Sequence, residues 1–166
     1  MAALVIINAT YPEKGVNKEI ATKIATTLIN CDGINTLINV GEEYTGVDED
    51  VQLKAVYSIW LAFRNITCGT AAINKDQAVA LFDTGIDIIH QLKSVEGQFT
   101  SLILEHVFCT LDNIVFAYNY ITKEHFQDKG ILSKCLDAFK KDDTWECRSE
   151  NVFVSVTSFL PQALPR

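Results

Sequence analysis

Residues that break helices or form turns are scarce in this 166-residue sequence, which has eight glycines and three prolines. Collagen-like and low-complexity chains are therefore excluded. Charged residues make up only 21% of the chain and hydrophobic residues 48%, a balance that excludes an intrinsically disordered protein. No Lys or Arg precedes the apolar segment 2–9, although a secretory signal would have one there. No stretch approaches the ~20 consecutive apolar residues of a transmembrane helix, so we expect no membrane partner.

Basic residues are the minority among the charges, with 14 Lys and Arg against 21 Asp and Glu and a net charge of −7. A nucleic-acid-binding protein needs a basic surface to neutralise phosphates, so we expect no nucleic-acid partner. An acidic chain suits a basic protein or peptide instead.

Cysteines and histidines offer no sign of a metal or catalytic centre. The five cysteines are odd in number and include no CxxC pair, which argues against a disulfide scaffold or a zinc site and favours reduced thiols in the cytoplasm or nucleus. None of the three histidines stands at a metal-ligand spacing from a cysteine or another histidine. The sequence contains no nucleophile–His–acid set and no glycine-rich phosphate loop. We therefore expect no enzyme activity, no cofactor and no metal.

Two short phrases recur along the chain. In the first, an Asp stands one or two places before a Gly, and Ile and an apolar helical run follow. Its glycines are Gly33, Gly85 and Gly130, separated by 52 and 45 residues. In the second, an Asn stands near the end of a long apolar segment. These are Asn8, Asn65 and Asn113, separated by 57 and 48 residues. Because the two phrases alternate along the chain, they indicate an internal repeat.

Each repeat is expected to hold three helices. A short helix ends at the Gly, which adopts left-handed geometry without steric cost, and the chain turns into a second helix. A polar loop then leads to a long third helix with apolar residues every three or four positions. Strand signals are weak. The expected helices are 18–30, 34–40, 51–67, 76–82, 86–93, 100–118, 121–128, 131–140 and 145–160.

Three helices per unit, with a period in the forties, is typical of armadillo-type solenoids. The sequence therefore predicts an all-α, right-handed helical solenoid of about three and a half repeats in one domain. The partial repeat covers 1–14, and the full repeats cover about 15–70, 71–120 and 121–160. The alternative for the partial repeat is a short N-terminal helix. Solenoid ends need polar caps, so we expect possible self-association through uncapped ends.

The stretch from Phe63-Arg-Asn-Ile-Thr-Cys-Gly-Thr to Phe82-Asp-Thr-Gly-Ile-Asp-Ile-Ile-His-Gln-Leu resembles the armadillo repeat family. Within that family it is most similar to the importin-alpha adaptors of nuclear import. In that family the third helices line a concave groove, where an Asn ladder holds the backbone of an extended peptide. A Trp one turn before each Asn packs against Lys side chains of the peptide, and acidic residues receive their ammonium groups.

The resemblance implies a peptide-binding groove. Its residues in this chain are Asn8, Leu61, Asn65, Thr70, Glu105, His106, Cys109 and Asn113. The Trp positions depart from the family, because Leu61 and Cys109 stand four places before their Asn. Trp60 is expected to point away from the groove into the core. The asparagines have an alternative structural role at the helix ends, and His106 and Cys109 have an alternative place in the core.

The resemblance implies a protein-binding module that holds an extended basic segment, like a nuclear-localisation signal, for nuclear protein import. Cytoplasm and nucleus are the expected locations. Because the Trp positions are lost, a second interpretation stays open. In that interpretation the chain is a non-transport armadillo scaffold or a regulatory protein-interaction fragment with a degenerate groove.

Overall fold

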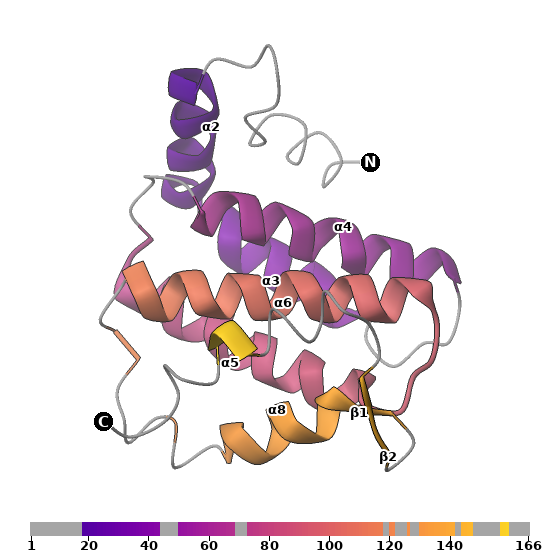
Figure 1. The fold of residues 1–166 in the computed structure, drawn as a ribbon. Coiled ribbons are helices and arrows are strands. Elements are labelled where there is room, and N and C mark those ends of the chain that lie inside the picture. The colour runs from indigo at the N-terminus through magenta and orange to yellow at the C-terminus, as the bar shows by residue number, and fades with distance from the viewer. Residues whose placement is uncertain are drawn as a thin grey trace.

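A computed structural model of the chain describes residues 18–43, 50–68, 73–117, 120–121, 126, 130–141, 144–147 and 157–159. The helices are α2 (Lys18–Asn30), α3 (Gly33–Glu43), α4 (Asp50–Thr67), α5 (Lys75–Leu92), α6 (Gln98–Ala117) and α8 (Ile131–Phe139). Two short antiparallel strands follow, β1 (Lys140–Lys141) and β2 (Thr144–Cys147). The described part is dominated by helices (Figure 1), which confirms the predicted all-α class.

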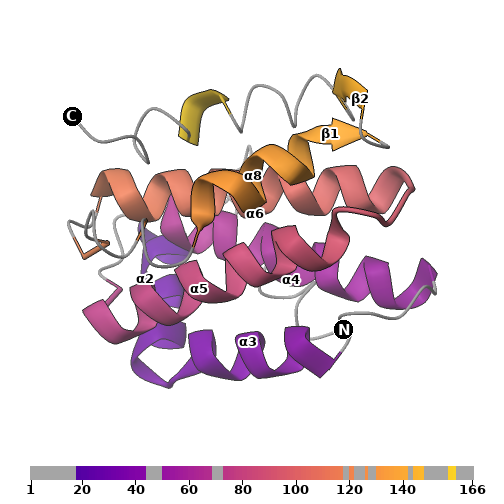
Figure 2. The same ribbon diagram turned by 90° about the horizontal axis from the view of Figure 1, so that it is seen from below.

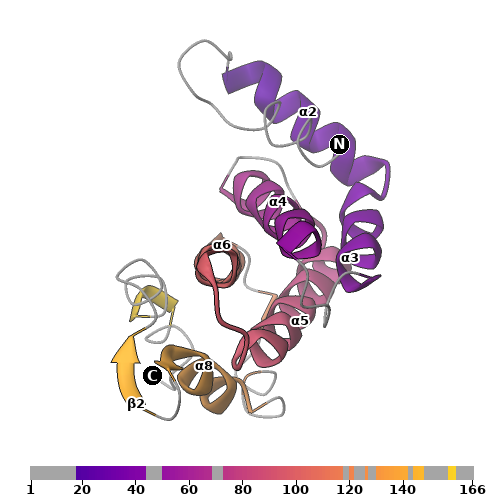
Figure 3. The ribbon, with the colours of Figure 1, turned by 90° about the vertical axis from the view of Figure 1, so that its right-hand side faces the viewer.

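The helices form two layers. Helices α4 and α6 lie side by side and run in the same direction, as the colours in Figure 1 show. Helices α3, α5 and α8 follow one another in the second layer and run the opposite way (Figure 2). The end-on view in Figure 3 shows this second layer curving around α4 and α6, with α2 set against α3.

The core lies between the layers and is rich in aromatic side chains. Trp60 is 1% exposed and its ring lies 5.3 Å from that of Phe63, so the prediction that it packs in the core is confirmed. Phe159 belongs to the helical residues 157–159 and packs against the rings of Phe82 and Phe108. Residues 157–159 therefore pack against the core through Phe159.

Four polar contacts between distant residues have sequence separations of 46 to 48 residues, and the contact of Arg64 with His106 has a separation of 42. The four are Gln77 Nε2 to Ile29 O, Asn113 Nδ2 to Thr67 Oγ1, Lys134 Nζ to Asp87 Oδ1, and Ser158 Oγ to Asp112 Oδ2. These contacts join α2 to α5, α4 to α6, α5 to α8, and α6 to residues 157–159. In these four cases an element contacts another that lies about 47 residues further along the chain.

Most predicted helix bounds agree with the structure to within two residues. The predicted helix 18–30 is α2, 51–67 is α4, 100–118 is α6 and 131–140 is α8. The predicted helix 121–128 lies almost entirely outside the described residues. Amphipathic periodicity thus identified these four helices correctly, because each buries one apolar stripe against the core.

Gly85 does not end a helix, so the prediction of separate helices 76–82 and 86–93 is wrong. Helix α5 continues through Gly85, which is buried. A Cβ atom there would lie 2.7 Å from Leu111 Cδ2 and 3.2 Å from Trp60 Cη2. Gly85 therefore allows α5 to approach α4 and α6 closely, and does not supply a left-handed conformation.

The other two marker glycines have different roles. At the turn between α2 and α3 the left-handed residue is Asp32, with φ of 57°. Gly33 opens α3, and a Cβ on it would lie 2.7 Å from Leu28 O. Gly130 has φ of +58° before α8, in agreement with the expected left-handed glycine. The same sequence motif, Asp followed by Gly and Ile, therefore adopts three different local structures in this chain.

The predicted helix 145–160 is wrong at its beginning, since 144–147 form β2. Lys140 pairs with Cys147 and Lys141 with Thr144 across a bulge. Only 157–159 of this range are described as helical. The backbone pairing of a tight hairpin replaces the first turn of the expected helix.

Helix α6 is long and apolar enough to cross a membrane by length and composition, contrary to the expectation that no stretch comes near this limit. Half of its most apolar window is buried inside the protein, and a helix in a protein core passes the same test. Its composition is therefore weak evidence for a membrane span.

Candidate functional site

The candidate site lies where α4 and α6 run side by side. Leu61 and Asn65 of α4 and Cys109 and Asn113 of α6 are all half-buried there. The sequence placed these residues at equivalent positions of successive third helices, and the structure places them on neighbouring helices. The other predicted groove residues on α4 and α6 are Glu105 and His106, whereas Asn8 and Thr70 lie outside the described residues.

His106 does not lie on an open face, contrary to the expectation that it faces the groove. His106 is only 4% exposed. The imidazole packs against the Tyr57 ring at 5.3 Å between ring centres. The core alternative given above for His106 is therefore the one that the structure supports.

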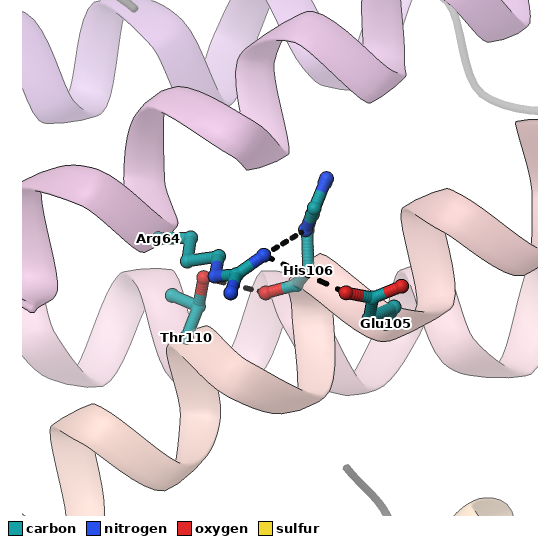
Figure 4. A network of polar contacts seen from close by, with 4 residues as sticks. All are labelled: Arg64, Glu105, His106 and Thr110. Carbon is teal, nitrogen blue, oxygen red and sulfur yellow. Dashed lines mark hydrogen bonds and ion pairs between the residues drawn. The ribbon is translucent and has the colours of Figure 1, made fainter. Parts of the chain in front are cut away.

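Arg64 connects α4 and α6. It is not among the site residues predicted from the sequence. Its Nη1 atom lies 3.1 Å from His106 Nδ1 and 3.6 Å from Glu105 Oε1 (Figure 4). Its position in the sequence could have identified it. Arg64 stands beside Asn65 near the end of a third helix and 42 residues before His106, close to the repeat spacing.

The contact with Arg64 fixes the protonation of His106. A guanidinium carries only donors, so Nδ1 accepts and the proton of the neutral ring is on Nε2. Burial, together with the charge of Arg64, lowers the pKa of His106 from 6.5 to about 4. Nε2 is buried and has no hydrogen-bond partner among the described residues. His106 therefore presents a lone pair, not a positive charge, to the junction.

The two asparagines differ in their surroundings. Asn113 Nδ2 donates to Thr67 Oγ1 at 3.1 Å, and this hydroxyl donates in turn to the carbonyl oxygen of Phe63 at 2.9 Å. Asn65 Nδ2 is buried without a hydrogen-bond partner in the described part of the chain. Asn113 thus has a structural role between α4 and α6, and a role of either residue in peptide binding stays a prediction.

The thiols differ in burial. Cys31 and Cys68 are exposed, Cys109 is half-buried and Cys135 is buried. Burial raises the pKa of Cys135 to about 12, with a smaller opposing effect from Lys134. Among residues that the structure describes, no three His, Cys, Asp or Glu side chains come together as metal ligands do.

Comparisons with known proteins add no relative: no family model matches the chain, and no curated protein or solved structure matches it significantly. The armadillo resemblance accordingly stays a prediction from the sequence. Chemically, the junction offers half-buried apolar and amide side chains and one internal ion pair. These groups suit the binding of a polypeptide.

Proposed function

We propose that this chain is a protein-binding module built as an armadillo-type helical solenoid. The observation that carries the proposal is the set of polar contacts at separations of 46 to 48 residues. In a solenoid each unit contacts its neighbours one repeat away, and such stacking produces contacts at similar separations. The Arg64–His106 contact, at 42 residues, is somewhat shorter. The alternation of the Asn and Gly phrases supports the same repeat.

The binding surface in this proposal is the side of α4 and α6 that faces away from the second layer of α3, α5 and α8 (Figure 3). Solenoid proteins bind partners along an extended surface made by equivalent elements of successive units. Here that surface combines half-buried Leu61, Leu102 and Cys109 with Asn113. Phe116 near the end of α6 is 81% exposed, which is unusual for a large aromatic side chain. Apolar contacts and amide hydrogen bonds would both contribute to holding a polypeptide.

Of the two functions implied by the resemblance, the non-transport scaffold has more support than the import adaptor. The adaptor needs Glu105 to receive an ammonium group from its cargo, and Glu105 is already paired with Arg64. It also needs aromatic faces for the cargo's Lys side chains. Leu61 and Cys109 stand at those positions and have no such face.

Fluorescence anisotropy with two labelled peptides tests the proposal. One peptide is rich in lysine, and the second has each Lys replaced by Gln. A scaffold that binds the peptide backbone binds both with similar affinity. Asn113→Ala then weakens both several-fold, because a hydrogen bond contributes about 0.5–1.5 kcal/mol. His90→Ala on the exposed side of α5 is the matched control and leaves both affinities unchanged.

The outcomes separate the two functions. Binding that is at least tenfold tighter for the lysine-rich peptide would favour the import adaptor over the scaffold. Failure of both peptides to bind would refute the binding of extended segments on α4 and α6. Thermal unfolding of Asn113→Ala, measured in parallel, corrects for the lost contact with Thr67.

A further inference from the structure

A position suited to a guanidinium group is built into the junction of α4 and α6, and the chain fills it with its own Arg64. Two acceptors on consecutive α6 residues, Glu105 Oε1 and His106 Nδ1, converge on one guanidinium nitrogen (Figure 4). The guanidinium comes from the other helix, so the contact is not a local pair within one helix. The shared nitrogen, Nη1, carries two N–H donors, one of which is hydrogen-bonded to His106 Nδ1, while Glu105 Oε1 lies at ion-pair distance.

One of the two acceptors, His106, has contacts that do not involve Arg64. His106 is 4% exposed, and its ring packs on Tyr57. The hydroxyl of Thr110 donates to the carbonyl oxygen of His106 at 2.7 Å, within the same turn of α6. The burial of the imidazole and its packing on Tyr57 do not depend on the guanidinium, so they favour the same ring position when Arg64 is removed.

The position lies at the boundary between the interior and solvent. The side chain of Arg64 is 39% exposed, and that of Glu105 is 17% exposed. A guanidinium from solvent therefore reaches the acceptors once the side chain of Arg64 is absent, because the path that Arg64 occupies becomes open.

We infer that Glu105 and His106 form a guanidinium-binding site, and that Arg64 is the specificity-determining residue that keeps basic side chains of a partner out of it. The second half of this inference rests on the proposed function. Arg64 is attached to the same protein, so its effective concentration at the site reaches the millimolar range or above. A partner's Arg must displace it, and the surface of α4 and α6 consequently does not select basic segments.

Chemical rescue tests the site without any peptide. The Arg64→Ala variant is heated with about 50 mM ethylguanidinium chloride or with the same concentration of sodium chloride. We expect ethylguanidinium to raise the Tm of this variant by about 2–4 °C relative to sodium chloride. Wild type and the double variant Arg64→Ala/Glu105→Gln gain nothing. Lys134→Ala, which removes the ion pair with Asp87, is the matched control and also gains nothing.

A titration with peptides tests the specificity. Arg64→Met keeps an apolar stem of similar length, so it serves even if Arg64→Ala does not fold. An arginine-containing peptide is expected to bind Arg64→Met several-fold more tightly than its glutamine counterpart, whereas wild type binds the two equally.

The two experiments fail in distinguishable ways. Absence of rescue in folded Arg64→Ala overturns the guanidinium site. If Arg64→Ala does not fold, equal binding of the two peptides to Arg64→Met overturns it instead. Rescue combined with equal peptide binding by Arg64→Met overturns the specificity role. Rescue without binding of any peptide to either protein supports the site and refutes the proposed function.

Discussion

Protonation of His106 should make the stability of this protein fall in mild acid. The ring is neutral in the folded chain, because Nδ1 accepts from Arg64 and the surroundings are buried. The pKa is about 4 in the folded state against 6.5 for an unperturbed histidine. As the pH falls below 6.5, the unfolded chain takes up a proton that the folded chain does not bind. Stability attributable to His106 is therefore complete above pH 6.5 and decreases until about pH 4.

The size of the effect follows from the two pKa values. Each tenfold difference in proton affinity is worth about 1.36 kcal/mol, so the full loss below pH 4 is about 3 kcal/mol. At about pH 4.5 the expected loss is about 2–3 kcal/mol, a large share of the stability of an ordinary domain.

Urea unfolding followed by circular dichroism, at about pH 7.5 and about pH 4.5, measures this loss. His106→Asn is the informative variant, because Oδ1 of Asn accepts from Arg64 as Nδ1 does and does not titrate in this range. The variant is less stable than wild type at neutral pH, since its smaller side chain leaves a cavity. Its stability changes less between the two pH values, by about 2–3 kcal/mol.

Asp and Glu side chains in general ionise in the same pH range, and the difference between wild type and variant cancels their contribution. His90→Asn on the exposed side of α5 is the control, and it should retain the pH dependence of wild type. If wild type and His106→Asn lose the same stability on acidification, His106 is not buried as a neutral acceptor and the reasoning is refuted.

Three further predictions concern packing, capping and thiols. Gly85→Ala should lower the free energy of unfolding by about 1–3 kcal/mol in urea titrations, because the new Cβ meets buried side chains; an unchanged midpoint would contradict the close approach of α5. Gln77→Glu should keep the capping box and lose the donor to the α2 carbonyl, at about 1–3 kcal/mol, whereas exposed Gln91→Glu should be neutral. Alkylation read by mass spectrometry should modify exposed Cys31 long before buried Cys135, whose pKa is about 12; equal rates would disprove the burial of Cys135.

The sequence by itself determined the helical class and the long helices other than α5. An amphipathic helix buries one stripe against any core, so its apolar period is visible without knowledge of its neighbours. The bounds of α2, α4 and α6 were accordingly predicted within two residues. The repeat spacing of the Asn phrase, 48 residues between Asn65 and Asn113, agrees with the separations of the observed contacts.

Only the tertiary structure decided what the marked residues contact. Gly85 was interpreted as a helix end, because a glycine's need for left-handed geometry is local, whereas its need for space depends on Leu111 and Trp60 from other helices. His106 was placed on the groove for a similar reason. Helical spacing gives the direction of a side chain but not the helix that covers it, and here α4 supplies Tyr57 and Arg64.

The same distinction holds for the candidate site. The residue types of Glu105 and Asn113 suggested the binding of a basic peptide. Whether their donors and acceptors are available for a peptide depends on partners that are distant in sequence. Arg64 and Thr67 of α4 supply those partners. The residue type shows what each side chain is able to bind. Packing determines which of its donors and acceptors are already bound within the protein.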